Sequence, residues 1–130
     1  MPATPVPADL ADHLALALTP GLGPKLTAAV LAHFGTAAAA RAATARQLEA
    51  VPLIGAKLAG KIADGLRAAD VDAEWRLIER FGVRCVPLGS PDYPAPLAAI
   101  PDPPPLLYLR GEFAPADANA VGIVGSRACT

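Results

Sequence analysis

A duplicated seven-residue segment constrains this 130-residue chain more than any other feature of its sequence. The segments Pro-Gly-Leu-Gly-Pro-Lys-Leu at residues 20–26 and Pro-Leu-Ile-Gly-Ala-Lys-Leu at residues 52–58 align without a gap. An aliphatic residue follows each copy at the same spacing, Val30 in the first and Ile62 in the second. This repeat indicates two copies of one supersecondary unit that bury their apolar faces together.

Helical patterns flank each copy of the repeat. Residues 8–18 place leucines on one helical face, and residues 24–34 begin with proline and stop before a glycine. The second copy lies between a capping box formed by Thr44 and Gln47 and a helix predicted over residues 56–68. Each unit therefore has the form of a helix-hairpin-helix, in which a tight turn joins two helices.

Two further helices are expected outside these units. A short alanine-rich helix follows its cap Thr36, and Asp70 or Asp72 can cap a helix that stops at Gly82. This last helix carries large apolar residues at helical spacing that are predicted to pack in the core: Trp75, Ile78 and Phe81.

Beyond residue 82 the sequence pattern changes. Residues 83–88, 106–109 and 121–124 are apolar runs of strand length, and residues 89–105 form a proline-rich connector. The third run is apolar throughout, which is typical of a strand buried in a parallel sheet.

The predicted fold class is mainly α, with two domains. Residues 1–70 are expected to form a tandem helix-hairpin-helix (SAM-like) domain. Residues 71–130 are expected to form a connecting helix, the proline-rich connector and the first strands of an incomplete α/β, Rossmann-like domain.

The two turns have the chemistry of a phosphate-binding element. Gly21 and Gly23 permit a tight hairpin, and unpaired amides at the next helix N-terminus favour an anion. In the second turn Leu53 replaces the first glycine, so it must find a conformation compatible with a Cβ, and it narrows the approach of a phosphate. The first turn is therefore the better candidate. The candidate residues of both turns are Gly21, Leu22, Gly23, Lys25, Gly55, Lys57 and Lys61.

The distribution of charge also favours contact with a polyanion. The chain has a formal net charge of −1, but residues 18–68 hold six basic and two acidic side chains, a local charge of +4. No element for recognition of base edges is evident, so sequence-independent DNA binding is expected. Paired hairpins also serve in protein docking, and a protein-interaction module without DNA contact is the alternative. The lysines distinguish the two, because an apolar docking surface does not use them.

Several function classes find little support. Cys85 and Cys129 are isolated, and His13 and His33 lack nearby partners, so neither a metal site nor a cofactor is expected. No nucleophile–base pair is visible, which argues against an enzyme such as a nucleotide-processing hydrolase. No membrane span and no signal peptide is recognised, so a cytoplasmic location is expected.

The second half of the chain resembles a known protein family. The relevant residues are Asp92–Leu97, Ile100, Asp102–Tyr108, Gly111 and Val121–Arg127. Their order and spacing are similar to the signature of the DNA-processing protein A family (DprA, also called Smf). The resemblance implies a protein that binds single-stranded DNA in natural transformation and that helps to load the RecA recombinase. Duplex DNA is a second expected ligand.

The same resemblance suggests further site residues and a Rossmann domain that extends further. It implies that Gly125, Ser126 and Arg127, after the last predicted strand, contribute to the single-strand site, whereas no dinucleotide fingerprint is present. The remaining Rossmann domain, with its homodimer surface and any RecA-contacting region, would follow Thr130. We therefore expect residues 1–82 to fold cooperatively and residues after Val83 to be less ordered.

Overall fold

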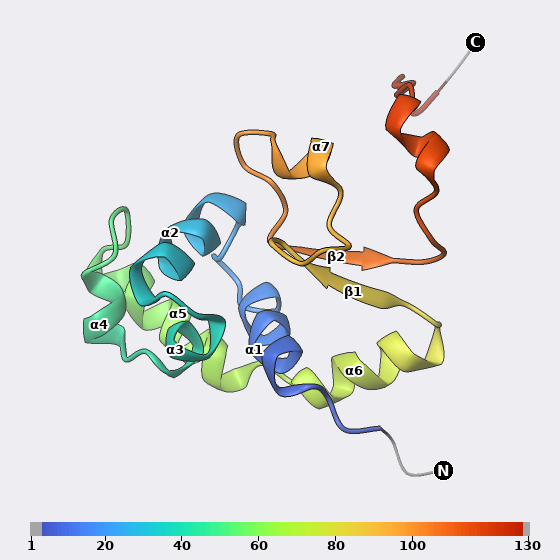
Figure 1. Cartoon of the computed structure of the whole chain (residues 1–130). Helices are drawn as coiled ribbons and strands as arrows, with labels where there is room; N and C mark the ends of the chain where they lie inside the picture. Colours follow the sequence, from blue (N-terminus) through green and yellow to red (C-terminus); the bar gives the residue numbers. More distant parts are fainter. Residues whose placement is uncertain (1–3, 129–130) are drawn as a thin grey trace.

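The computed structural model describes residues 4–128, in which helices dominate (Figure 1). The order of elements begins with six helices: α1 (Ala8–Ala17), α2 (Pro24–Phe34), α3 (Ala37–Ala42), α4 (Ala45–Glu49), α5 (Ala56–Ala68) and α6 (Val71–Arg80). The remaining elements are β1 (Arg84–Pro87), α7 (Ala95–Ala98), β2 (Leu106–Leu109) and the 3-10 helix η1 (Pro115–Asn119). The mainly helical class with a small sheet confirms the predicted fold class.

Side-chain caps fix the N-termini of three of the described helices, α3, α4 and α6. The Thr36 hydroxyl accepts a hydrogen bond from the Ala39 amide at 3.1 Å and starts α3. Thr44 and Gln47 form the predicted capping box of α4. Of the two candidate caps for α6, Asp70 is the one used, since its carboxylate accepts from the backbone of the first turn. These boundaries follow from short-range hydrogen bonds that the sequence encodes directly.

The two repeated units share one core. The first unit is α1, a turn and α2, the second is α4, a turn and α5, and α3 connects them. Leu22 and Ile54, the central residues of the two turns, are both buried in this core. Burial of these two side chains holds each turn against its own helices. The other large core side chains include Leu16, Val30, Leu48 and Ile62.

Helix α1 is shared between this core and a second one. Leu14 and Ala15 of α1 pack with Val71 and Ile78 of α6, and with partly buried residues of the sheet. In the sheet β1 pairs antiparallel with β2, with Arg84 opposite Leu109. The expectation that order is lost after Val83 is therefore wrong for the chain up to Leu109, because the hairpin gains its apolar burial on α1 and α6.

Two other expectations need correction. Residues 121–124 form no strand, and the Val121, Ile123 and Val124 side chains are 84%, 95% and 96% exposed. The physical reason is that no described strand pairs with them and no described helix covers them. Phe81 is 53% exposed instead of buried, because it follows the last turn of α6, where the Arg80 guanidinium lies 5.4 Å from its ring centre. Trp75 is partly buried, and Ile78 is buried as predicted.

The connector between the strands contains structure that its composition did not suggest. Its short helix α7 lies above the sheet (Figure 1). The hydroxyl of buried Tyr93 donates to the Pro104 carbonyl at 2.7 Å and ties the two ends of the connector together. A hollow of about 720 Å³, lined mainly by apolar residues, lies between α7, β2 and η1.

Candidate nucleic-acid interface

The first turn is a tight hairpin closed by its own backbone. Gly21 has φ 89°, and the Leu22 amide donates to the Thr19 carbonyl at 3.3 Å. Gly23 is the N-cap of α2 and is extended, and its carbonyl accepts from the Thr27 amide at 2.9 Å. The positive φ is the reason that glycine suits position 21.

The second turn has the same backbone geometry. The Ile54 amide donates to the Val51 carbonyl at 3.2 Å, and the Gly55 carbonyl accepts from Ala59 at 2.8 Å. Leu53 has φ 73°, close to the angle of Gly21. The expectation that Leu53 would find a conformation suited to a side chain is therefore wrong. It takes the glycine conformation at a cost of about 1–2 kcal/mol.

Both turns expose backbone amides that no described group accepts. In the first turn these are the amides of Gly23, Lys25 and Leu26. The second turn leaves the equivalent amides free and adds that of Ala56, because the first turn has Pro24 at that position. No side chain caps α2 or α5. Each turn can therefore bind an anion such as a phosphate group.

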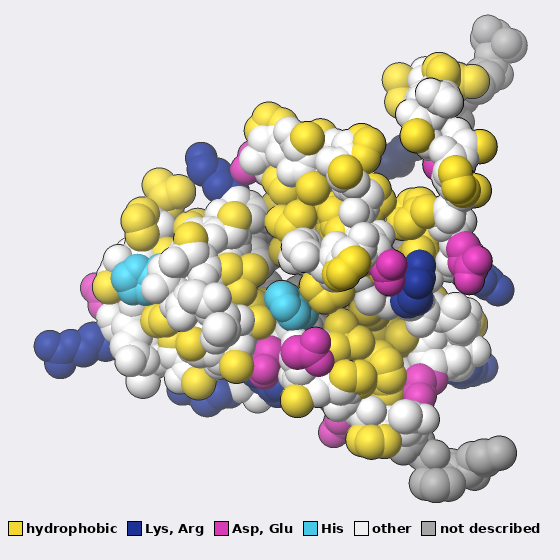
Figure 2. Space-filling model, viewed as in Figure 1, with side chains coloured by type: hydrophobic (Ala, Val, Ile, Leu, Met, Phe, Trp, Pro, Cys, Tyr) yellow, Lys and Arg dark blue, Asp and Glu magenta, His cyan; other side chains and the backbone are white. Residues whose placement is uncertain are grey.

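Exposed lysines lie on the helix that follows each turn. Lys25, Lys57 and Lys61 are exposed and form no ion pair among residues 4–128. Two arginines of the basic segment are instead paired, Arg41 with Asp12 at 3.2 Å and Arg67 with Asp64 at 2.5 Å. Figure 2 shows Lys and Arg side chains projecting from the margin of the helical tandem. The unpaired positive charge near the turns is thus carried mainly by lysines.

Lys61 lies nearer to the first turn than its position in the second unit suggests. A hollow of about 470 Å³ is lined by Gly21 of the first turn together with Leu58, Lys61 and Gly65 of α5. A Cβ built on Gly21 would meet the Leu58 side chain at 3.4 Å. The first turn and α5 therefore form one composite surface. Sequence spacing could not indicate this, because it results from packing of one unit on the other.

The remaining candidate residues lie elsewhere. Gly125, Ser126 and Arg127 are exposed, and the Ser126 hydroxyl donates to the Ala128 carbonyl at 2.6 Å. The segment after η1 lies at the opposite side of the molecule from the loop between α4 and α5 (Figure 1). The structure packs the first turn against α5 and leaves these three residues apart. Leu22 is buried and its amide donates to Thr19, so it supports the turn and offers no donor to a ligand.

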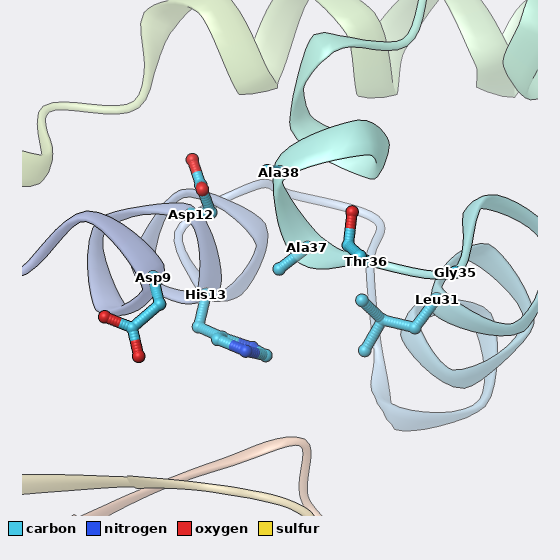
Figure 3. A pocket seen from close by; sticks show the side chains of 8 residues that line it. All are labelled: Asp9, Asp12, His13, Leu31, Gly35, Thr36, Ala37 and Ala38. Atoms are coloured by element: carbon cyan, nitrogen blue, oxygen red, sulfur yellow. The ribbon is translucent and has the colours of Figure 1, made fainter.

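A separate hollow of about 380 Å³ lies beside α1 (Figure 3). His13 points toward its open side, whereas Asp12 points the other way and binds Arg41. The Thr36 hydroxyl on the rim is occupied as the cap of α3. This arrangement has no nucleophile held against a base.

The thiol and phenol near α6 are held in their neutral forms. Burial, with a smaller effect of the Glu74 carboxylate, raises the pKa of Cys85 to about 11. Burial and a 2.8 Å hydrogen bond to Glu74 raise the pKa of Tyr108. Cys129 lies outside the described residues. Among residues 4–128, no cluster of metal-ligating side chains is present, and no helix is long and apolar enough to cross a membrane.

Comparison with protein families gives one match in each half of the chain. Residues 14–68 match the family model of the SAM-like helix-hairpin-helix tandem, and residues 84–130 match that of DNA recombination-mediator protein A. The resemblance found in the sequence is thereby confirmed, and the chain is connected with DNA recombination. No curated protein and no solved structure matches the chain.

Proposed function

We propose that this chain binds DNA through the phosphate backbone, without a preference for base sequence and without catalysis. The observation that carries the proposal is the first turn, where three amides have no described acceptor and lie beside the exposed Lys25. Free amides at a helix N-terminus and a nearby lysine are a common solution for binding a phosphate. The recombination-mediator family match supports the same ligand.

The proposal assigns different roles to the candidate residues. Gly21 and Gly23 allow close approach of a phosphate, Leu22 anchors the turn, and Lys25 supplies charge. Gly55, Lys57 and Lys61 form a second contact, and its phosphate-binding part is weaker because the Leu53 side chain narrows the approach of a phosphate. A separate patch of Gly125, Ser126 and Arg127 contacts the strand at the other side of the molecule.

Single-stranded DNA is the proposed ligand, and RecA is the proposed partner, in natural transformation in the cytoplasm. Residues 1–70 are proposed as the DNA-binding domain and residues 71–130 as the start of the Rossmann-like domain through which the protein dimerises. The family resemblance supports these statements.

Fluorescence anisotropy with a labelled 20-nucleotide single strand, at several salt concentrations, tests the proposal. If about two to four phosphates are neutralised, log K falls against log salt with a slope between about −1.5 and −3.5. Lys25→Ala weakens binding more than Lys57→Ala. Arg76→Ala, an exposed base on α6 and outside both turns, is the matched control and leaves binding unchanged.

Two outcomes would contradict the proposal. Absence of binding at low salt would favour the alternative, a docking module for proteins. Equal losses for Lys25→Ala and Arg76→Ala would show that only the overall charge matters and that the first turn has no special role.

A further inference from the structure

Leu53 combines two properties that rarely occur together. Its side chain is 67% exposed, and among residues 4–128 it is the non-glycine residue with a positive φ, 73°. At the equivalent place of the first turn the chain has Gly21, whose φ of 89° is unstrained. The loop that carries Leu53 projects from the helical tandem between α4 and α5 (Figure 1).

Folding does not explain a leucine at this position. The core residue of the turn is its neighbour Ile54, which is 4% exposed, so Leu53 adds little to the packing. A glycine would give the same backbone without the side-chain penalty. Backbone strain that no packing in the folded state offsets indicates a role in binding a ligand.

The surroundings of Leu53 indicate the chemistry of that ligand. The exposed Lys57 and Lys61 follow it on α5, and the free amides of Gly55 and Ala56 adjoin it. Figure 2 shows hydrophobic side chains on this projecting loop, with Lys and Arg side chains at the same margin of the molecule. An apolar tip beside positive charge and anion-binding amides complements a ligand with both apolar faces and phosphates.

Single-stranded nucleic acid has this combination, whereas a duplex stacks its base faces inside the helix. We propose that Leu53 packs on an unstacked base or its sugar while the neighbouring phosphate binds the amides and lysines of the second turn. Leu53 then makes this turn selective for single strands, and the first turn, with Gly21, contacts any phosphate backbone. This inference rests on the proposed DNA binding and assigns a source of strand preference within it.

The test compares a fluorescein-labelled dT20 single strand with a labelled 20-base-pair duplex by anisotropy, using the full chain. Leu53→Gly and Leu53→Asn keep the turn conformation, because both residues accept positive φ, but remove the apolar tip. Both variants are expected to lose about 3- to 10-fold in affinity for dT20 and to keep or gain affinity for the duplex. Leu53→Met, which keeps an apolar tip, is expected to stay within about twofold of the natural chain.

Leu77→Ala is the matched control, since Leu77 is an exposed leucine on α6, an element outside the second turn. It is expected to change neither affinity, and circular dichroism should show unchanged helix content in all variants. If the natural chain binds DNA but Leu53→Gly leaves the ratio of the two affinities unchanged, the inference is wrong and the proposed function stands; the tip would then fit a protein partner. If the natural chain binds neither the single strand nor the duplex, the inference and the proposed function are both wrong.

Discussion

Gly60 and Gly65 both lie in α5, but a side chain would meet different surroundings at the two positions. A Cβ on Gly60 has no neighbour within 4 Å, whereas a Cβ on Gly65 would lie 2.9 Å from the Thr19 Cγ2 atom. Thr19 is buried, and its hydroxyl donates to the Ala15 carbonyl at 2.7 Å, so it cannot easily move away. Gly65 thus allows α5 to approach the start of the first turn.

We therefore expect opposite effects of one substitution at two sites of the same helix. Gly60→Ala should raise the free energy of unfolding by up to about 1 kcal/mol, because alanine favours helix. Gly65→Ala should lower it by about 1–2 kcal/mol, since overpacking against Thr19 exceeds the gain in helix propensity. Urea unfolding followed by circular dichroism measures both. A stabilised Gly65→Ala variant would mean that the contact between α5 and the first turn is looser than described.

The β1–β2 hairpin is held by two tyrosine hydroxyls in different environments. Tyr93 is buried and donates to the Pro104 carbonyl at 2.7 Å, whereas Tyr108 is 48% exposed and donates to Glu74 of α6 at 2.8 Å. Removal of the first hydroxyl leaves a carbonyl without its partner inside the connector. Removal of the second leaves a carboxylate that water can reach.

The two Tyr→Phe variants should therefore differ in stability. Tyr93→Phe is expected to lower the free energy of unfolding by about 1–3 kcal/mol, and Tyr108→Phe by about 0.5–1 kcal/mol. Thermal unfolding monitored by circular dichroism provides the comparison. A larger loss for Tyr108→Phe would show that the link from β2 to α6 matters more than closure of the connector.

The extent of the folded unit follows from the sharing of α1 between two cores. Because α6, β1 and β2 pack on a helix that also belongs to the tandem, the helical part and the hairpin should open together. Residues 110–128 are instead exposed throughout. The protected part of the molecule should therefore end near Leu109.

Limited trypsin digestion tests this boundary. Cleavage after Arg110 and Arg127 is expected first, leaving a product that ends at Arg110, while Arg80 and Arg84 are protected by α6 and the sheet. Mass spectrometry of the products identifies the cleaved bonds. Early cleavage after Arg84 would instead support the boundary expected from the sequence, in which residues 1–82 fold independently and the remainder is poorly ordered.

Much of this fold could be predicted from the sequence because its signals are local. Proline at the start of α2, the Thr44–Gln47 capping box and the repeated turns act over a few residues, so their consequences do not depend on distant parts of the chain. The helix-hairpin-helix tandem and the candidate lysines were recognised on this basis. The resemblance of residues 92–127 to the recombination-mediator family was likewise visible as a motif.

Tertiary structure decided what depends on contacts between distant segments. Residues 121–124 have the composition of a buried strand, but a strand needs a hydrogen-bonded neighbour, and none of the described segments supplies one. The approach of Lys61 to the first turn results from packing of one unit on the other. Leu53 takes a glycine conformation because Ile54 and the flanking helices fix the turn, and that packing outweighs the local preference of a leucine.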